Sequence, residues 1–217
     1  MLTQITSILG PAISASPIAA SADSDIFEAY VLTLVVRAAK EEGATITFVD
    51  RKGAVATELR LRTSPGYIYS SAKNYTHIVI EFASRPALEA HVGVKVAGKS
   101  GVLHELDVAI LDRAEAENCR RNSVSPRSSR ILIGAECKFY ASALQLGLAR
   151  GFVGLVSDIS AKSPFFVTNT SSTSVERLLS HRVRHGWEKD ISPTCKNTEV
   201  DRLVHAFRSA FKNFKAR

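Results

Sequence analysis

Two short segments of the sequence carry charged residues at the spacing that places side chains on one face of a β-strand. Glu105 and Asp107 are two positions apart in LHELDVAIL, and Glu136 and Lys138 are two positions apart in ILIGAECKFY. Alternate residues of a strand face the same side, so each pair should share a face. If the strands are neighbours, Asp107, Glu136 and Lys138 converge on one polar patch. Carboxylates beside an ammonium group suit a hard divalent cation.

The apolar residues of these strands should face the opposite way, towards the core. On the first strand, the side chains expected to share this face are those of Leu106, Val108 and Ile110. On the second strand they are those of Ile131, Ile133, Ala135, Cys137 and Phe139. Cys137 is therefore expected to be a core thiol. His104 should lie opposite Asp107 and have a structural role.

A further carboxylate, Glu28, lies within a helix expected from about Ser24 to Glu42. At about 100° per residue, Glu28 falls in the stripe of Leu32, Val35 and Ala39, so it should face inward. Burying a carboxylate without a partner is costly. We therefore expect Glu28 to meet a cation, a hydrogen-bond donor or a metal-bound water.

Other segments indicate the sheet and helices that position these residues. Period-two patterns and turn residues predict strands at Thr45 to Val49, Val55 to Arg62, His77 to Phe82, His91 to Ala97, Leu103 to Leu111 and Ile131 to Phe139. A helix at Tyr140 to Arg150 and a strand at Phe152 to Ser157 should complete a strand-helix-strand unit with a parallel pair. A possible strand at Phe165 to Thr168 and helices at Ser174 to His185 and Asn197 to Phe214 follow.

The segment Asp112 to Arg130 lacks apolar periodicity, which is typical of a long exposed loop. Its arginines could contact phosphates, or could simply be solvated; they are Arg113, Arg120, Arg121, Arg127 and Arg130. A second basic group, His181, Arg182, Arg184 and His185 near Trp187, could bind nucleic acid or complement a helix dipole. The apolar stripe of the last helix should pack on the domain, with a dimer interface as the alternative.

Composition is consistent with one folded domain. The chain has 217 residues, 45% hydrophobic and 23% charged, and no apolar run reaches the roughly 20 residues of a membrane-spanning helix. We expect residues 1–22 to form an N-terminal arm rather than a secretory signal, and residues 23–217 to form the domain. A net charge of +7 favours polyanionic partners. Three widely spaced cysteines favour a reducing compartment, the cytoplasm.

The order of these residues resembles the PD-(D/E)xK nuclease superfamily, which has the restriction-endonuclease-like fold. The resemblance covers about residues 24–157 and implies an α/β protein with an α-β-β-β-α-β core, a mixed central sheet flanked by helices and C-terminal helices beyond it. It implies that Asp107, Glu136 and the backbone carbonyl of Cys137 bind Mg²⁺ or Mn²⁺, that Glu28 supports the metal, and that Lys138 orients or deprotonates the attacking water. Leu106 replaces the proline of the motif, and Glu105 has no fixed role in the family.

The function implied by the resemblance is metal-dependent hydrolysis of phosphodiester bonds in nucleic acid, with DNA the expected substrate. The alternative is a catalytically silent nuclease-like fold that binds nucleic acid or assembles with other proteins. A homodimer and partner proteins that deliver the substrate are both compatible with the sequence. We find no phosphate-binding glycine loop, no nucleophile elbow and no histidine pair of the metalloprotease type.

Overall fold

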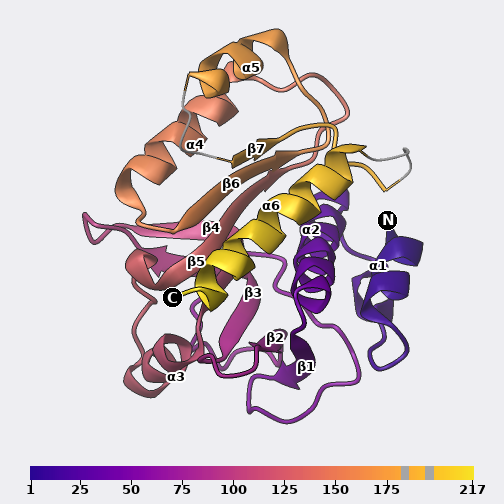
Figure 1. Ribbon diagram of the computed structural model, residues 1–217, viewed down its shortest axis with the longest axis vertical. Helices are drawn as coiled ribbons and strands as arrows, with labels where there is room; N and C mark the ends of the chain where they lie inside the picture. The colour runs from indigo at the N-terminus through magenta and orange to yellow at the C-terminus, as the bar shows by residue number, and fades with distance from the viewer. Residues whose placement is uncertain (182–185, 194–197) are drawn as a thin grey trace.

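A computed structural model describes residues 1–181, 186–193 and 198–217 of the chain. The protein has a mixed α/β fold built on a sheet of seven strands in the order β1-β2-β3-β4-β5-β6-β7 (Figure 1). The strands are β1 Thr45–Asp50, β2 Thr76–Glu81, β3 Leu88–Ala97, β4 Leu103–Asp112, β5 Ile131–Lys138, β6 Ser163–Thr168 and β7 Gly186–Glu188. Pairing is antiparallel from β1 to β5 and parallel from β5 to β7.

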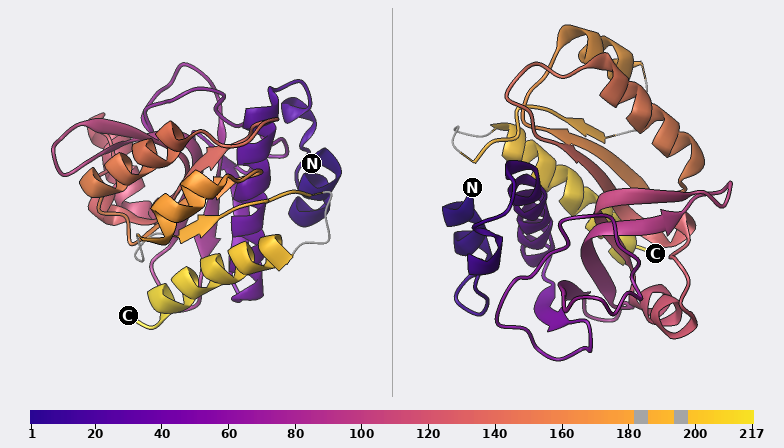
Figure 2. Two further views of the ribbon diagram at one scale, coloured as in Figure 1. Left: turned by 90° about the horizontal axis from the view of Figure 1, so that it is seen from above. Right: turned by 180° about the vertical axis from the view of Figure 1, so that it is seen from behind.

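Helices flank this sheet on both faces (Figure 2). They are α1 Leu2–Leu9, α2 Asp23–Glu41, α3 Arg113–Asn122, α4 Leu146–Asp158, α5 Thr173–Ser180 and α6 Thr198–Lys215, with short 3₁₀ turns at Ser16–Ile18 and Ser128–Arg130. Residues of α1, α2 and α6 contribute to the core on one face, and residues of α3, α4 and α5 to the core on the other. None of these helices is both long enough and apolar enough to cross a membrane, within the ranges that the structure describes.

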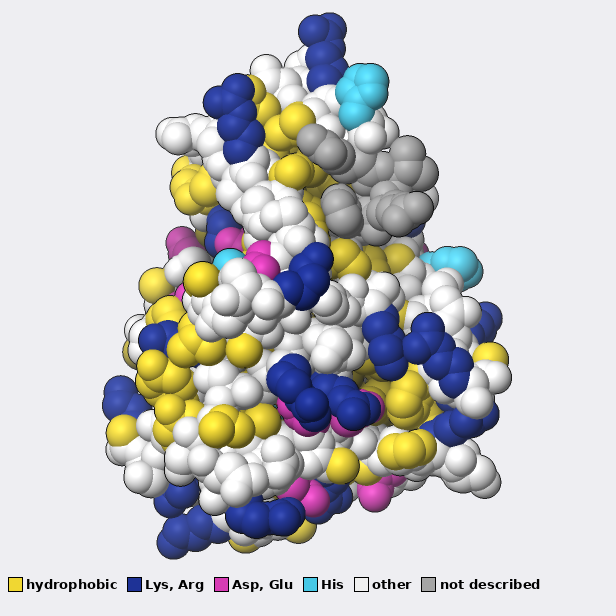
Figure 3. All heavy atoms as spheres, turned by 90° about the vertical axis from the view of Figure 1, so that its left-hand side faces the viewer, with side chains coloured by type: hydrophobic (Ala, Val, Ile, Leu, Met, Phe, Trp, Pro, Cys, Tyr) yellow, Lys and Arg dark blue, Asp and Glu magenta, His cyan; other side chains and the backbone are white. Residues whose placement is uncertain are grey.

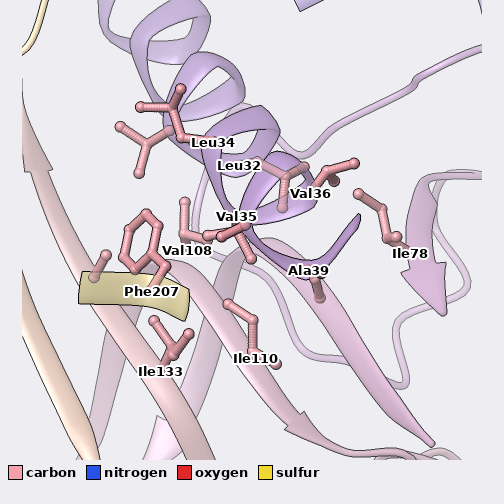
Figure 4. Packing of buried hydrophobic residues seen from close by; sticks show 14 of the residues in the cluster. Leu32, Leu34, Val35, Val36, Ala39, Ile78, Val108, Ile110, Ile133 and Phe207 are labelled. Carbon is pink, nitrogen blue, oxygen red and sulfur yellow. The ribbon is translucent and has the colours of Figure 1, made fainter. Parts of the chain in front are cut away.

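The first core lies between the sheet and the long helix α2. Leu32, Val35 and Ala39 of α2 pack towards Val108 of β4 and Ile133 of β5, with α6 alongside (Figure 4). The helix is buried on nearly every side because the sheet, α6 and α1 all pack against it. Burial of each large aliphatic side chain stabilises the fold by about 1.5–3 kcal/mol. This packing holds α2, and with it Glu28, against the sheet.

The second core corrects the sequence interpretation of the crossover after β5. A strand was expected at Phe152 to Ser157, but these residues belong to α4, whose buried residues Ala149, Phe152 and Val156 recur at helical spacing. Phe152 stacks on Phe166 of β6 with ring centroids 5.1 Å apart. The expected helix at Tyr140 to Arg150 begins later, at Leu146. A parallel strand does follow the helix, but it is β6, which overlaps the possible strand expected at Phe165 to Thr168 and not the one expected at Phe152 to Ser157.

The expected loop from Asp112 to Arg130 is also wrong, because residues Arg113–Asn122 form α3. Its buried residues are Glu115, Ala116 and Cys119, and the Glu115 carboxylate accepts hydrogen bonds from Arg127 at 2.7 and 2.9 Å. A buried carboxylate with a partner twelve residues away gives no apolar periodicity. Apolar periodicity therefore could not predict this helix.

The strand expected at Val55 to Arg62 is absent from the sheet. Only isolated bridges join Val49 to Val55 and Ser14 to Glu58. The Glu58 carbonyl accepts the Thr76 hydroxyl and the Arg60 carbonyl accepts the Thr76 N–H, both at 2.7 Å. Because these groups are satisfied by one residue of β2, the segment forms no ladder.

The ends of the chain pack against the same core. In residues 1–22, Ile5 and Leu9 of α1 are buried in the first core, and α1 contacts α2. The helices α5 and α6 overlap the ranges expected for them, with α5 beginning at Thr173 and α6 ending at Lys215, and the apolar stripe of α6 packs inward. Residues Arg182, Arg184 and His185 of the second basic group, and Cys195, lie outside the described residues.

Candidate functional site

The site is created by a reversal of side-chain direction within the β3–β4 hairpin. The register runs from Val92 opposite Val108 to Val94 opposite Leu106, and Gly93 between them has φ +59°. Val92 and Val108 pack in the first core, whereas Val94 and Leu106 pack in the second. A glycine at positive φ commonly marks such an irregularity. The expectation that Leu106, Val108 and Ile110 share a face is therefore wrong at Leu106.

Asp107 lies at this reversal, where β4 and β5 separate. The last β4–β5 pair on this side is Val108 with Ala135. Beyond it, the Cys137 N–H donates to Asp107 Oδ2 at 2.6 Å, so the side chain takes the place of a partner-strand carbonyl. Asp107 is only 6% exposed. Because the N–H and C=O of one residue in a strand point to the same side, the Cys137 carbonyl should face this gap too.

Lys138 links the two carboxylates that the sequence places on neighbouring strands. Its Nζ lies 2.6 Å from Glu136 Oε1 and 3.5 Å from Asp107 Oδ2. Burial alone would lower the pKa of Lys138, but these two carboxylates raise it. Burial raises the pKa of Asp107 and of Glu136, and Asp107 raises that of Glu136 further. The three residues predicted to converge do so, and the Cys137 thiol packs in the first core.

Glu28 and Glu105 bring two more carboxyl groups to the same place. Phe27 of α2 packs on Phe139, with ring centroids 5.5 Å apart, which brings the start of α2 to the end of β5. Burial, followed by the charge of Asp107, raises the pKa of Glu28 to about 8. The same two causes, with Glu136, raise the pKa of Glu105 to about 7. Glu105 is thus part of the cluster, although its position in the sequence left its role open.

The residue types of this cluster suit the binding of a divalent cation, but the side chains are not yet arranged as a metal site. Carboxylate oxygens of Asp107, Glu136 and Glu28 are hard ligands of the kind that Mg²⁺ and Mn²⁺ prefer. Four carboxyl groups gather around the Lys138 ammonium group, and burial, together with the neighbouring carboxylates, raises the pKa values of Glu28 and Glu105. Within the described ranges, however, no three acidic, histidine or cysteine side chains are already grouped as a metal site. Lys138 occupies the position between Asp107 and Glu136.

The arginines expected beside the site lie elsewhere. They belong to α3 and to the segment that leads into β5, so they lie where β4 ends and β5 begins, whereas Glu136 and Lys138 are at the far end of β5. Most of them have carboxylate partners: Arg120 binds Glu89, Arg113 binds Glu117, Arg127 binds Glu115 and Arg130 lies near Asp112, while Arg121 is exposed. Figure 3 shows several acidic side chains directly beside basic ones on one face of the protein.

Sequence analysis missed a buried polar network on β2 and β3. Glu89, 1% exposed, accepts two hydrogen bonds from Arg120, at 2.7 and 2.8 Å, and lies 2.9 Å from His91 Nε2. The His77 and His91 rings stack with centroids 4.9 Å apart. The two-residue spacing of Glu89 and His91 is the signal that could have revealed it. His104, in turn, pairs with Asp158 at 2.7 Å, at the end of α4.

Comparison with known proteins adds little to this geometry. No protein-family model matches the chain. No curated protein matches it either. A solved structure titled "Crystal Structure of Protein of Unknown Function AF1548" is 14% identical and covers 60% of this chain and 91% of its own, with a TM-score of 0.32. A likeness at that score supports no conclusion about the fold or the activity.

Proposed function

We propose that this chain is a divalent-metal-dependent nuclease of the PD-(D/E)xK type, with a restriction-endonuclease-like core. The observation that carries the proposal is the convergence of Asp107, the Cys137 backbone and Lys138 in the gap between β4 and β5. The order α2, β3, β4, β5, α4, β6, with three antiparallel strands followed by a parallel one, agrees with the α-β-β-β-α-β order of that core. Strands β1 and β2 extend one edge, and β7 the other.

In this proposal each residue of the cluster has a distinct task. Asp107, Glu136 and the Cys137 carbonyl hold the cation, and Glu28 supports it from α2. When bound, the cation supplies Lewis acidity that polarises the scissile phosphate and stabilises the charge developing on it. Lys138 leaves its ion pair with Glu136 and positions the attacking water for in-line displacement.

The burial of Asp107 gives a physical reason for its place in this reaction. Its carboxylate is fixed by the Cys137 N–H, so it would need little reorientation to hold a cation. Glu136 is held only by Lys138 within the described residues, so it can turn towards a ligand once that ion pair opens. The site therefore combines one fixed ligand and one adjustable ligand.

A cleavage assay tests this proposal. Linear and circular duplex DNA, single-stranded DNA and RNA are incubated with the protein in Mg²⁺ or Mn²⁺, and product is quantified for Glu136→Gln and Lys138→Met. Glu81→Gln and Lys99→Met, both at exposed positions, serve as matched controls. We expect cleavage of at least one substrate, a loss of about a hundredfold or more in the two site variants, and none in the controls. Equal cleavage by all five proteins would refute the assignment.

One observation favours a second function, a catalytically silent nuclease-like module that binds nucleic acid. The ammonium group of Lys138 lies 2.6 Å from Glu136 Oε1 and already compensates that carboxylate. Calorimetry separates the two functions. Uptake of Mn²⁺ that is lost in Asp107→Asn supports the nuclease, whereas nucleic-acid binding without any Mn²⁺ uptake supports the module. A homodimer or a partner protein remains compatible with either function.

A further inference from the structure

A second polar site lies between the turn after β1, the adjoining parts of β2 and β3, and helix α3. It is a pocket of about 250 Å³, which we call the α3 pocket. Its polar wall consists of Arg51, Lys52, His77, Glu89, Arg113 and Arg120, with Glu117 beside them. Gly93 of β3 lies beside Asp107 of β4, between the pairs Val92–Val108 and Val94–Leu106. Glu89 is four residues from Gly93, so the pocket lies about 13 Å from Asp107 along the strand. It is therefore separate from the candidate metal site.

The charges that line the α3 pocket do not balance. Four cationic side chains face two carboxylates. Arg120 makes two hydrogen bonds to Glu89, and Arg113 lies 2.8 Å from Glu117, so both carboxylates are already paired. Within the described part of the chain, neither Arg51 nor Lys52 makes an ion pair. The pocket thus has an excess of positive charge on its walls, and Arg51 and Lys52 are not held in ion pairs, although Lys52 lies close enough to Asp50 to lower the pKa of that carboxyl.

A buried histidine in the wall is incompletely hydrogen-bonded. His77 is 4% exposed, and its Nε2 lies 3.6 Å from Glu89 Oε2. Its Nδ1 is buried and has no hydrogen-bond partner in the described residues. Leaving a buried polar atom unsatisfied is costly. Because this nitrogen is shielded from solvent, the cationic side chains of the wall are the groups that an anion in the pocket would meet.

We propose that the α3 pocket binds a phosphate group. The pocket is small, recessed and lined by arginines and a lysine, which suits a compact oxyanion with several acceptor oxygens. The phosphate could be free in solution or could end a nucleic-acid strand. The second source rests on the proposed nuclease function, but binding of phosphate itself does not.

The first arm of the experiment measures inorganic phosphate binding by calorimetry, on the full chain without divalent cations. We expect wild-type protein to bind, and Arg51→Gln and Lys52→Gln each to weaken binding by about tenfold or more, because each removes a charge-assisted hydrogen bond. These residues lie in a surface turn, so the fold should tolerate both changes. Arg121→Gln is the matched control, because Arg121 is an exposed arginine of α3 outside the pocket. No binding by wild type, or equal binding by all four proteins, would overturn the proposal.

The second arm identifies the source of the phosphate. A short single-stranded DNA with a 5′-phosphate is compared with the same strand ending in a 5′-hydroxyl, each with and without competing inorganic phosphate. Tighter binding of the phosphorylated strand, lost in Arg51→Gln and reversed by phosphate, assigns the pocket to strand ends. Equal binding of both strands, with phosphate binding intact, assigns it to free phosphate. Asp107→Asn should abolish cleavage but leave phosphate binding unchanged, which separates failure of this proposal from failure of the nuclease proposal.

Discussion

The buried carboxylate of Glu89 should make the protein depend strongly on Arg120. Burial would raise the pKa of Glu89, but hydrogen bonds from Arg120 and from the two histidines lower it well below its usual range, so Glu89 is ionised at neutral pH. Arg120→Met removes both guanidinium hydrogen bonds, at 2.7 and 2.8 Å, and leaves a buried charge. The remaining cation, Arg113, is 4.0 Å away. Removing one partner of a buried pair costs about 3–5 kcal/mol.

The assays are urea unfolding and thermal unfolding, each monitored by circular dichroism. A loss of about 3–5 kcal/mol corresponds to a melting temperature lower by roughly 10 °C for a chain of this length. Arg113→Met is the matched control. Arg113 is 43% exposed and its own ion pair is at the surface, so its loss should cost less than about 1 kcal/mol. Adding Glu89→Gln to Arg120→Met should recover part of the stability, because no charge is then left unpaired. Equal losses in the two single variants would refute the reasoning.

Two further predictions concern β3 and the turn that joins it to β4. Gly93→Ala and Gly101→Ala each place a side chain at positive φ, +59° and +84°, which should lower the free energy of unfolding by about 1–2 kcal/mol. Only Gly93→Ala, whose Cβ would lie 3.4–3.6 Å from neighbouring atoms, should also reduce metal-dependent cleavage. Equal cleavage by the two variants would contradict the role of the reversal at Gly93. Burial lowers the pKa of His91 from 6.5 to about 4 despite its hydrogen bond to Glu89, so the unfolded chain binds the proton first as the pH falls. The free energy of unfolding should therefore decrease from about pH 6.5 towards pH 4, by about 2 kcal/mol between pH 7 and pH 5. His91→Gln should lack this decline, and His205→Gln, at an exposed position, should retain it. A decline of the same size in both variants would exclude His91 as its cause.

The residues of the candidate site were accessible from the sequence because their positions follow from local periodicity. The two-residue spacing of Glu136 and Lys138 within an apolar strand predicts their common face, and the helical stripe of α2 predicts that Glu28 faces inward. These signals depend only on each element's own geometry. The convergence of Asp107 with Lys138 also requires that β4 and β5 be neighbours, which they are, and it is shaped by the reversal at Gly93.

What could not be predicted depends on contacts between distant segments. The reversal at Gly93 is a property of the β3–β4 pair, and neither strand alone indicates it. Helix α3 buries Glu115 through a partner in a later segment, so apolar periodicity was no guide. The charges of Glu89 and Arg120 lie in different elements, and only the folded chain shows that they neutralise each other.

The most direct test of the central claim is a crystal of the protein grown with Mn²⁺, with anomalous scattering recorded to locate the ion. The account predicts an anomalous peak in the gap between β4 and β5, within about 2.5 Å of carboxylate oxygens of both Asp107 and Glu136, and the loss of that peak in Asp107→Asn. A Mn²⁺ peak elsewhere with this gap empty, or a wild-type crystal with the Lys138–Glu136 ion pair intact and no peak beside it, would contradict the claim.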